Sequence, residues 1–247
     1  MQEIFLSLLG NIMWLLLGVL AVKILNLVRV VVPSRLAWRL VEPRKVVLCS
    51  SNSTVTDTGE YLRPATGIGQ VRALVLVVTS LNRAYGKIDF RNVFLSSDQM
   101  HEFLENDLIL LGGAKNNELT ARYLALMGTS QPAIMKGSTI IWRKGLEQEW
   151  VDHEAEEFHG LTKDGKVVSD FGLIMRTQSP FTNQPRTVVL IAGSHTFGTV
   201  AAAKFFTESL HIELRGEIHK RNISLLVSAQ VINGYPTSIK VERYYAW

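Results

Sequence analysis

The sequence predicts an α/β fold, with one N-terminal transmembrane helix followed by a single cytoplasmic domain around a mostly parallel sheet. Three observations lead to this fold class: an uncharged apolar run near the start, short apolar segments alternating with helical periodicity, and a strong hairpin signal near the end. Strands that alternate with helices are typical of a parallel sheet covered by helices on both faces. The chain of 247 residues leaves enough length after the first helix for one well-buried core.

The first element is an apolar run from Ile4 to Val22, 19 residues without a charge. About 20 residues are needed to cross the hydrocarbon core of a bilayer. A secretory signal peptide is the weaker alternative, because it needs a positively charged start, a shorter apolar core and a small-residue cleavage site. Here the chain starts with Met1-Gln2-Glu3, and the run ends at Lys23. We therefore predict a transmembrane anchor over residues 1–32.

Basic residues predict the orientation of this span. None precedes the helix, whereas the segment after it contains Lys23, Arg29, Arg35, Arg39, Arg44 and Lys45. Positive residues near a span stay in the cytoplasm, so the N-terminus is expected outside the cell inner membrane and the domain inside. A basic linker over residues 33–45 would lie beside anionic headgroups. The net charge of +4 therefore indicates the lipid bilayer as partner and no nucleic-acid polymer.

Residues 46–247 carry the pattern of a Rossmann-like domain. Short apolar runs predict strands over residues 46–49, 92–95, 107–111, 139–143, 172–176 and 187–192. Helical periodicity predicts helices over residues 70–85, 117–127 and 200–210, and Ser97 is expected to cap a short helix that ends at Leu104. Residues 23–40 are expected to continue as an amphipathic stretch, with a break at Pro33-Ser34 where the span passes into a membrane-hugging segment. Asn233-Gly234 predicts an antiparallel hairpin of residues 224–232 and 237–245. Residues 50–67 are expected to form a loop, and the acidic segment 147–157 has no prediction.

Three loops share one order: an apolar strand, a turn rich in Gly, Ser or Asn, and then a helix. In a parallel sheet these turns meet at the carboxyl ends of the strands, where open α/β sheets bind ligands. Each turn also places free N–H groups at a helix N-terminus, which favours an anion. The candidate ligand-binding residues are Ser51, Thr54, Tyr61, Arg63, Thr66, Gly67, Gly69, Gln70, Gly112, Gly113, Lys115, Asn116, Asn117, Gly193, Ser194, His195, Gly198 and Thr199.

A nucleotide-like ligand fits this set of residues. Arg63 can pair with a phosphate, and Tyr61 can stack on a base. The alternative interpretation is that the loops are ordinary solvated turns, with His195 a hydrogen-bonding residue at a helix start. Together, the three loops predict a polar pocket that favours anions.

No strong catalytic signature is present. The sequence has no zinc spacing of His and Cys, no Gly-x-Ser-x-Gly elbow and no Walker loop, so neither a metal nor a cofactor is predicted. Asp57, Glu60 and Glu118 lie near the loops, and one of them could attack or polarise a glycosidic bond. The alternative function is therefore a membrane-tethered enzyme acting on a nucleotide or nucleoside. Binding without turnover is the preferred hypothesis, and an adaptor with an empty pocket is a third possibility.

The apolar helix carries a second pattern. At about 100° per residue, one face holds Ser7, Asn11, Trp14, Gly18 and Ala21. Small residues let membrane helices approach closely, and a buried Asn can hydrogen-bond between them. We therefore predict helix association through Ser7, Asn11, Gly18 and Ala21, and a homo-oligomer.

The segments 58–70, 111–117 and 192–199 look like those of uncharacterised bacterial α/β proteins. The layout of one span followed by a Rossmann-like domain resembles that of membrane effectors in bacterial anti-phage systems, in which a nucleotide-sensing domain controls a membrane-disrupting helix. This resemblance concerns organisation and implies a signalling role in antiviral defence. The function expected from the sequence is a membrane-anchored sensor that passes ligand binding to self-associating helices.

Overall fold

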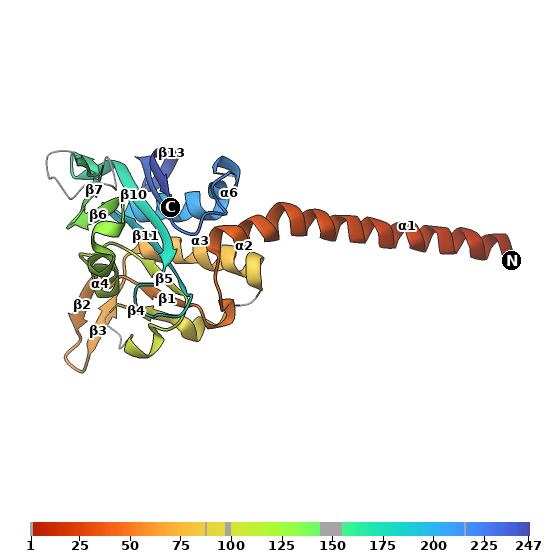
Figure 1. Cartoon of the computed structure of the whole chain (residues 1–247), viewed down its shortest axis with the longest axis horizontal. Helices are drawn as coiled ribbons and strands as arrows, with labels where there is room; N and C mark the ends of the chain where they lie inside the picture. Colours follow the sequence, from red (N-terminus) through yellow and green to blue (C-terminus); the bar gives the residue numbers. More distant parts are fainter. Residues whose placement is uncertain (1, 87, 97–99, 144–154, 215) are drawn as a thin grey trace.

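The computed structural model describes residues 2–86, 88–96, 100–143, 155–214 and 216–247. A long helix leaves one side of a mixed α/β domain and carries the N-terminus far from it (Figure 1). The helices are α1 (Gln2–Asn26), α2 (Val32–Trp38), α3 (Ile68–Tyr85), α4 (Glu118–Met127), α5 (Thr196–Lys204) and α6 (Leu210–Glu213). The predicted helices 70–85 and 117–127 correspond to α3 and α4. The predicted helix 200–210 corresponds to α5 and its π-helical continuation, Phe205–Ser209.

The central sheet has eight strands in the order β13-β12-β10-β11-β5-β1-β4, with β9 paired to β10. The strands are β1 (Val47–Ser50), β4 (Val93–Leu95), β5 (Leu108–Leu111), β9 (Leu161–Lys163), β10 (Lys166–Gln178), β11 (Thr187–Gly193), β12 (Ile223–Ile232) and β13 (Tyr235–Ala246). Strands β4, β1, β5 and β11 are parallel neighbours. The remaining pairs are antiparallel. The predicted α/β class, with a mostly parallel central sheet and antiparallel strands at the C-terminus, is confirmed.

The hairpin between β12 and β13 turns where the sequence predicts it. Asn233 and Gly234 both have positive φ angles, 51° and 74°. A two-residue hairpin turn of the type that matches strand twist needs positive φ at both central positions, which Asn and Gly adopt most easily.

Two smaller sheets were not predicted, although the strand expected over residues 139–143 is present as β7. One is the hairpin of β2 (Thr54–Asp57) and β3 (Leu62–Ala65), and the other joins β6 (Ala133–Lys136), β7 (Thr139–Trp142) and β8 (Glu156–Phe158). The expectation of a loop over residues 50–67 is thus wrong. All four residues of β2 are exposed and β3 contains Pro64, so the hairpin lacks a buried alternating pattern. The predicted helix start at Ser97 and most of the acidic segment 147–157 lie outside the described residues.

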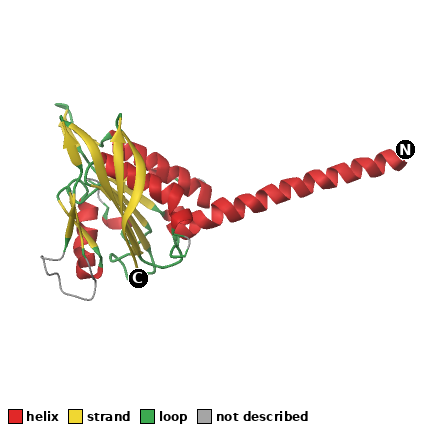
Figure 2. Cartoon of the chain, turned by 90° about the horizontal axis from the view of Figure 1, so that it is seen from above, coloured by secondary structure: helices red, strands yellow, loops and turns green. Residues whose placement is uncertain are grey.

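Different elements cover the two faces of the central sheet. Along β5, Ile109 and Leu111 belong to one core cluster, and Leu108 and Leu110 to the other. This division follows because successive side chains of a strand point to opposite faces. Helices α2, α3 and α5 supply buried residues to the first cluster, and α4 with β6 and β7 supplies the second. Figure 2 shows helices on both sides of the sheet.

Helix α1 continues into α2 through a π-helical turn, Leu27–Val31, so the predicted break at Pro33-Ser34 is absent. Pro33 directly follows the π-helical turn; a proline within a continuous helix removes one backbone hydrogen bond, and the local change of helical pitch lies next to it. The helix ends at Arg39, whose φ of 49° is left-handed.

The end of α2 belongs to the core of the domain. Trp38 is fully buried, donates a hydrogen bond from Nε1 to Ser80 Oγ (3.0 Å) and packs edge-on against Phe206, with 4.6 Å between ring centroids. Ala37 is buried beside it. This part of residues 23–40 therefore docks onto α3 and the π-helical turn after α5, in place of the predicted membrane-hugging stretch.

The residues just before Trp38 form one continuous apolar helix. Among the described residues, the helix Gly10–Trp38 is long and apolar enough to cross a membrane, and its most apolar window is not buried against the domain. A signal sequence near the N-terminus passes the same test of length and composition. The helix is thus compatible with a membrane span.

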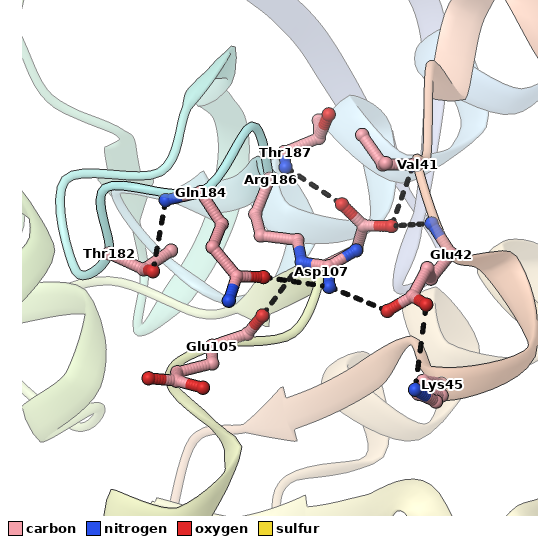
Figure 3. A network of polar contacts seen from close by, with 9 residues as sticks. All are labelled: Val41, Glu42, Lys45, Glu105, Asp107, Thr182, Gln184, Arg186 and Thr187. Carbon is pink, nitrogen blue, oxygen red and sulfur yellow. Dashed lines mark hydrogen bonds and ion pairs between the residues drawn. The ribbon is translucent and has the colours of Figure 1, made fainter.

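A polar network fixes the chain that follows α2 (Figure 3). The buried carboxylate of Asp107 accepts hydrogen bonds from the backbone N–H groups of Val41 (2.7 Å), Glu42 (2.6 Å) and Thr187 (2.8 Å). Burial raises the pKa of Asp107 above its ordinary value, although these N–H donors act in the opposite direction. Arg186 adds an ion pair to Glu42 at 2.6 Å. The residues after α2 are thus held at the starts of β5 and β11.

Arg176 on β10 holds the end of α2 from inside the domain. Its guanidinium is fully buried and donates to the carbonyl oxygens of Leu36 (2.8 Å), Ala37 (2.6 Å), Ile218 (3.0 Å), Lys220 and Arg221 (3.4 Å). The last carbonyls of a helix have no partner inside the helix and lie at the negative end of its dipole. Burial lowers the pKa of Arg176 to about 9. The long helix and the sheet are therefore joined by a buried polar contact.

Candidate functional site

The three predicted loops meet at the carboxyl ends of β1, β5 and β11, which are neighbours in the sheet. They surround a cavity of about 270 Å³, called here the three-loop pocket. Its lining residues are Ser51, Ser53, Gly67, Ile68, Gln70, Gly113, Lys115, Asn116, Gly137, Ser138, Gly193, Ser194, His195, Thr196 and Thr199. The residues that follow α2 contact the opposite ends of these strands. The pocket therefore lies at the far end of the sheet from the long helix.

Many of the predicted ligand-binding residues line this pocket. They are Ser51, Gly67, Gln70, Gly113, Lys115, Asn116, Gly193, Ser194, His195 and Thr199. Sequence reasoning missed two kinds of lining residue. Ser53, Ile68 and Thr196 lie within or beside the predicted loops and could have been included. Gly137 and Ser138 form the turn between β6 and β7, and no feature of the sequence indicates that this turn approaches the sheet.

The hairpin β2–β3 carries three predicted residues away from the pocket. Thr54, Tyr61 and Arg63 are exposed, and none of them is a lining residue. The predicted roles of Arg63 in pairing with phosphate and Tyr61 in stacking on a base are therefore not supported by their positions.

Asn117 organises the second loop from behind the pocket. It is buried and begins α4, where its Oδ1 accepts a hydrogen bond from the N–H of Thr120 at 3.0 Å. Its Nδ2 donates to the carbonyl oxygens of Cys49 and Leu111, both at 3.2 Å. One amide thus joins the ends of β1 and β5, so Asn117 is a structural residue here and not a lining residue.

Thr66 also acts from behind the pocket. Its Oγ1 donates to the carbonyl oxygen of Ser51 at 2.8 Å. Gly112 has a φ of 101°, and a Cβ there would lie 2.7 Å from the side chain of Ser51. Both residues fix the backbone around Ser51, so they shape the pocket without lining it.

The remaining two predicted glycines permit close packing around α5. A Cβ on Gly69 would lie 1.7 Å from Thr196 Oγ1, and a Cβ on Gly198 would lie 2.0 Å from the carbonyl oxygen of Phe171. Gly69 brings the start of α3 against the start of α5, and Gly198 brings α5 against β10. Two helix N-termini consequently lie side by side at the pocket.

Hydroxyl and amide groups supply the polar lining. Thr196 Oγ1 donates to Gln70 Oε1 at 3.1 Å, which fixes the orientation of the Gln70 side chain. Ser51 is only 1% exposed, and its Oγ has no hydrogen-bond partner among the described residues. A buried hydroxyl without a partner is costly, and a ligand atom in the pocket would give it one.

A buried carboxylate orients the His195 loop. Asp170 on β10 is fully buried. Its Oδ1 accepts from the His195 N–H at 3.1 Å and lies 3.3 Å from His195 Nδ1, while its Oδ2 accepts from the Gly198 N–H at 2.5 Å. Burial raises the pKa of Asp170, and its backbone donors and His195 oppose the rise. With Nδ1 facing the carboxylate, the imidazole would present Nε2 as its second polar atom.

Sequence reasoning missed Asp170 because it precedes His195 by 25 residues and lies on another strand. Nothing in the local pattern around Asp170 indicates that its strand would run beside the loop after β11. The partnership depends on the antiparallel register of β10 and β11, which pairs Gly172 with Gly193.

The charge of the pocket favours an anion. Lys115 is the cation among its described lining residues, and these include no carboxylate. The N-terminus of α3 adds partial positive charge, whereas the Asp170 carboxylate already accepts the N–H groups of His195 and Gly198 at the start of α5. The carboxylates considered for glycosidic chemistry, Asp57, Glu60 and Glu118, are not lining residues. Glu118 instead lines a separate cavity with Arg122.

In comparisons with known proteins, the chain matches no protein-family model and no curated protein sequence.

Proposed function

We propose that the chain is a membrane-anchored sensor that binds a nucleotide-like, phosphate-bearing ligand in the three-loop pocket. The observation that carries this proposal is the pocket itself, where the N-terminus of α3, Lys115 and the unpartnered Ser51 hydroxyl converge without a lining carboxylate. Anions bind at such helix N-termini because free N–H groups and the helix dipole both stabilise negative charge.

The size of the pocket narrows the ligand class. A cavity of about 270 Å³ is at the small end of the range of about 300–1,000 Å³ that is usual for small-molecule sites. This volume suits the phosphate and sugar of a single nucleotide. A larger ligand would extend out of the pocket towards the exposed hairpin β2–β3.

The buried contacts between the long helix and the domain favour a sensor over a domain that is attached to the membrane by a flexible tether. Trp38, Asp107 and Arg176 each fix the chain around the end of α2 through buried contacts. A flexible linker would let the domain turn independently of the helix. Here a shift of the sheet on ligand binding would move the helix with it. A role in antiviral defence rests on the resemblance in organisation and stays a prediction.

A branched side chain in place of Gly113, at the lining of the pocket, should weaken ligand binding. Gly113→Val adds two methyl groups beyond the Cβ, which would itself lie 2.8 Å from the Met135 side chain, at the lining of the pocket. We expect a loss of at least about tenfold in affinity, or about 1.4 kcal/mol. The measurement is calorimetric titration with the member of a nucleoside mono-, di- and triphosphate panel that most raises the Tm of the wild-type protein.

Two controls accompany Gly113→Val. Gly216→Val replaces a glycine whose added Cβ meets no atom within 4 Å, and Arg63→Ala removes the exposed hairpin arginine. Both should bind as the wild type does. Equal affinity of all three variants would show that the ligand binds elsewhere. A strong effect of Arg63→Ala would mean that the hairpin β2–β3 takes part in ligand binding.

The proposed membrane orientation has its own test. A cysteine introduced by Gln2→Cys should be labelled by an impermeant maleimide on intact cells, because the positive residues follow the span. The native Cys49 is buried and serves as the internal control for labelling of the folded domain. Labelling that appears only after lysis would reverse the orientation and place the pocket outside the cytoplasm.

A tethered hydrolytic enzyme is the second candidate function, and the pairing of Asp170 with His195 favours it. An imidazole oriented by a buried carboxylate can accept a proton from an attacking water. Turnover separates the two functions, because a sensor releases the ligand intact. Mass spectrometry of the bound nucleotide after incubation with the wild-type protein would decide between them.

A further inference from the structure

A second cavity lies between α3, α5 and the tip of the β12–β13 hairpin, and it shares no lining residue with the three-loop pocket. Its volume is about 430 Å³. Three parts of the chain form its walls, namely α3, α5 with its π-helical continuation, and the start of β13. We call it the α3 groove. The lining residues that matter below are Val71, Arg72, Val75, Lys204, Glu208 and Tyr235.

Exposed apolar side chains gather around this groove. On α3, Ile68 and Val75 are more than half exposed and Val71 is 40% exposed, and their spacing of three and four residues places them on one face of the helix. The opposite face of α3 already packs in the core. On the hairpin, Ile232 and Tyr235 are also more than half exposed, and they pair directly across the two strands, so their side chains lie on one face. Apolar side chains that gather in this way mark an interaction surface.

Arg72 holds the hairpin tip against α3. Its guanidinium donates a hydrogen bond to the carbonyl oxygen of Gly234 at 2.8 Å and lies 4.2 Å from the centre of the Tyr235 ring. Such a cation–π contact fixes both side chains. The wall of the groove is therefore ordered before any partner binds, and a contact with it costs less conformational entropy.

Lys204 and Glu208 give the groove both signs of charge. They are exposed and lie about one helical turn apart. In the part of the chain that the structure describes, neither of them takes part in an ion pair. A surface with both signs is complementary to itself, because a twofold axis can bring Lys204 of one copy beside Glu208 of the other. An anionic surface such as a lipid bilayer would meet one favourable and one unfavourable group.

We propose that two copies of this chain pair through the α3 groove, with the apolar face of α3 and the hairpin tip of one domain against those of the other. The choice of partner rests on the membrane anchoring proposed above, because copies held in one membrane share an orientation and a raised local concentration. Their twofold axis runs along the membrane normal and keeps equivalent residues at the same depth. Val75 of one copy therefore lies near Val75 of the other.

This contact is distinct from the predicted association of the long helices, since it joins the domains themselves. It also reaches the three-loop pocket, because Ile68 belongs to the exposed face of α3 and lines that pocket. A ligand in the pocket would touch the edge of the contact between the domains. Pairing of domains thus connects the pocket with the assembly of the chains.

The first test is crosslinking of the full chain by a short bifunctional maleimide in membranes from broken cells. The native Cys49 is buried, so Val75→Cys supplies the reactive thiol. We expect a crosslinked dimer, formed at least about tenfold faster than with Leu126→Cys, an exposed position on α4 that does not line the groove. Both variants also carry Asn11→Leu and Gly18→Ile, so the small-residue face of the long helix cannot cause the pairing.

A charge reversal identifies the partner. In the Val75→Cys chain, Lys204→Glu should slow crosslinking about tenfold or more, because it replaces an attraction by a repulsion in both halves of a symmetric contact. Adding Glu208→Lys should restore the rate, since both copies then carry the reversed pair. Lys166→Glu is the matched control, because Lys166 is exposed and lies outside the groove, and it should leave the rate unchanged.

Two results would overturn the proposal: equal crosslinking at positions 75 and 126, or a charge reversal that fails to restore the rate, which would indicate a partner other than a second copy. Carbonate extraction of the same membranes separates a failed anchor from a failed pair. A chain that is extracted and still crosslinks through Val75→Cys would refute the anchor and support the pair. A chain that stays in the membrane without this crosslink would refute the pair alone.

Discussion

Arg176→Met should lower the free energy of unfolding of the domain by about 3–5 kcal/mol, because it leaves several carbonyl oxygens without their hydrogen-bond donor. Methionine keeps much of the side-chain length, but it donates no hydrogen bond. The carbonyl oxygens of Leu36, Ala37 and Ile218 would then be buried without their partner. Each unsatisfied group costs about 1–3 kcal/mol, which relief from burying the guanidinium offsets in part.

Urea unfolding of the full chain in micelles, followed by tryptophan fluorescence, measures this loss. Arg243→Met is the matched control, because that arginine pairs with Glu156 where their side chains are 40% and 33% exposed. Such pairs contribute about 0–1 kcal/mol. Hydrogen exchange should show the effect of Arg176→Met first at the end of α2 and in residues 218–221. If Arg176→Met were no less stable than Arg243→Met, the packing of Trp38 alone would account for the attachment of α2 to the domain.

Arg176 also shows which features of the structure the sequence did not predict. The segments around β1, α3, β5, α4 and β11 were predicted well because each has a local cause. For example, α3 stops at Gly86, whose φ of 86° suits glycine, and Asn117 caps α4 through its own side chain. Such signals lie within a few residues of the structure that they determine.

The roles of Arg176 and Asp170 depend on contacts distant in sequence. Arg176 is 139 residues from Ala37, and nothing in the pattern of its own strand indicates that contact. The end of α2 shows the same limit in another way. Its apolar residues suit a membrane surface and a protein core equally, so composition alone did not reveal that Trp38 packs inside the domain.

The candidate site was predictable in outline for a topological reason. Parallel neighbours place their carboxyl ends together, so three loops in different parts of the sequence had to converge if the sheet order was right. The prediction failed for the hairpin β2–β3, because the chain between Ser53 and Gly67 turns away from the pocket before it reaches α3. The prediction placed Thr54, Tyr61 and Arg63 of that segment near the ligand, although only its two ends line the pocket.

The second large effect is expected for the long helix. It shows whether the helix transmits a response by associating with other helices or only anchors the domain. Asn11, Gly18 and Ala21 are exposed on the lone helix, and a Cβ on Gly18 would meet no atom within 4 Å. The side chain of Ser7 lies outside the described part of the chain. Pairing of helices through this face would give Asn11 a hydrogen bond of about 0.6–2 kcal/mol, or about 3–30-fold in association.

Asn11→Leu with Gly18→Ile should therefore abolish ligand-dependent depolarisation in cells while leaving membrane insertion and nucleotide affinity unchanged. A potential-sensitive dye reports the depolarisation, and crosslinking in membranes reports the association of helices. Ile12→Leu is a conservative control on the same helix outside the small-residue face, and it should behave as the wild type. A double variant that still associates and depolarises would exclude this face as the contact.

The stricter variant replaces residues 4–22 with a featureless span of leucine and alanine. Such a span keeps the apolar length that insertion needs, and it removes Asn11 and Gly18 together. The joint at Trp38, Asp107 and Arg176 is untouched, so ligand binding should still be transmitted as far as the end of α2. A sensor whose helices must pair would then bind its nucleotide normally and produce no response. Full activity of this chimera would instead mean that the helix only holds the domain at the membrane, and the pairing of Asp170 with His195 in a tethered enzyme would become the better account of the pocket.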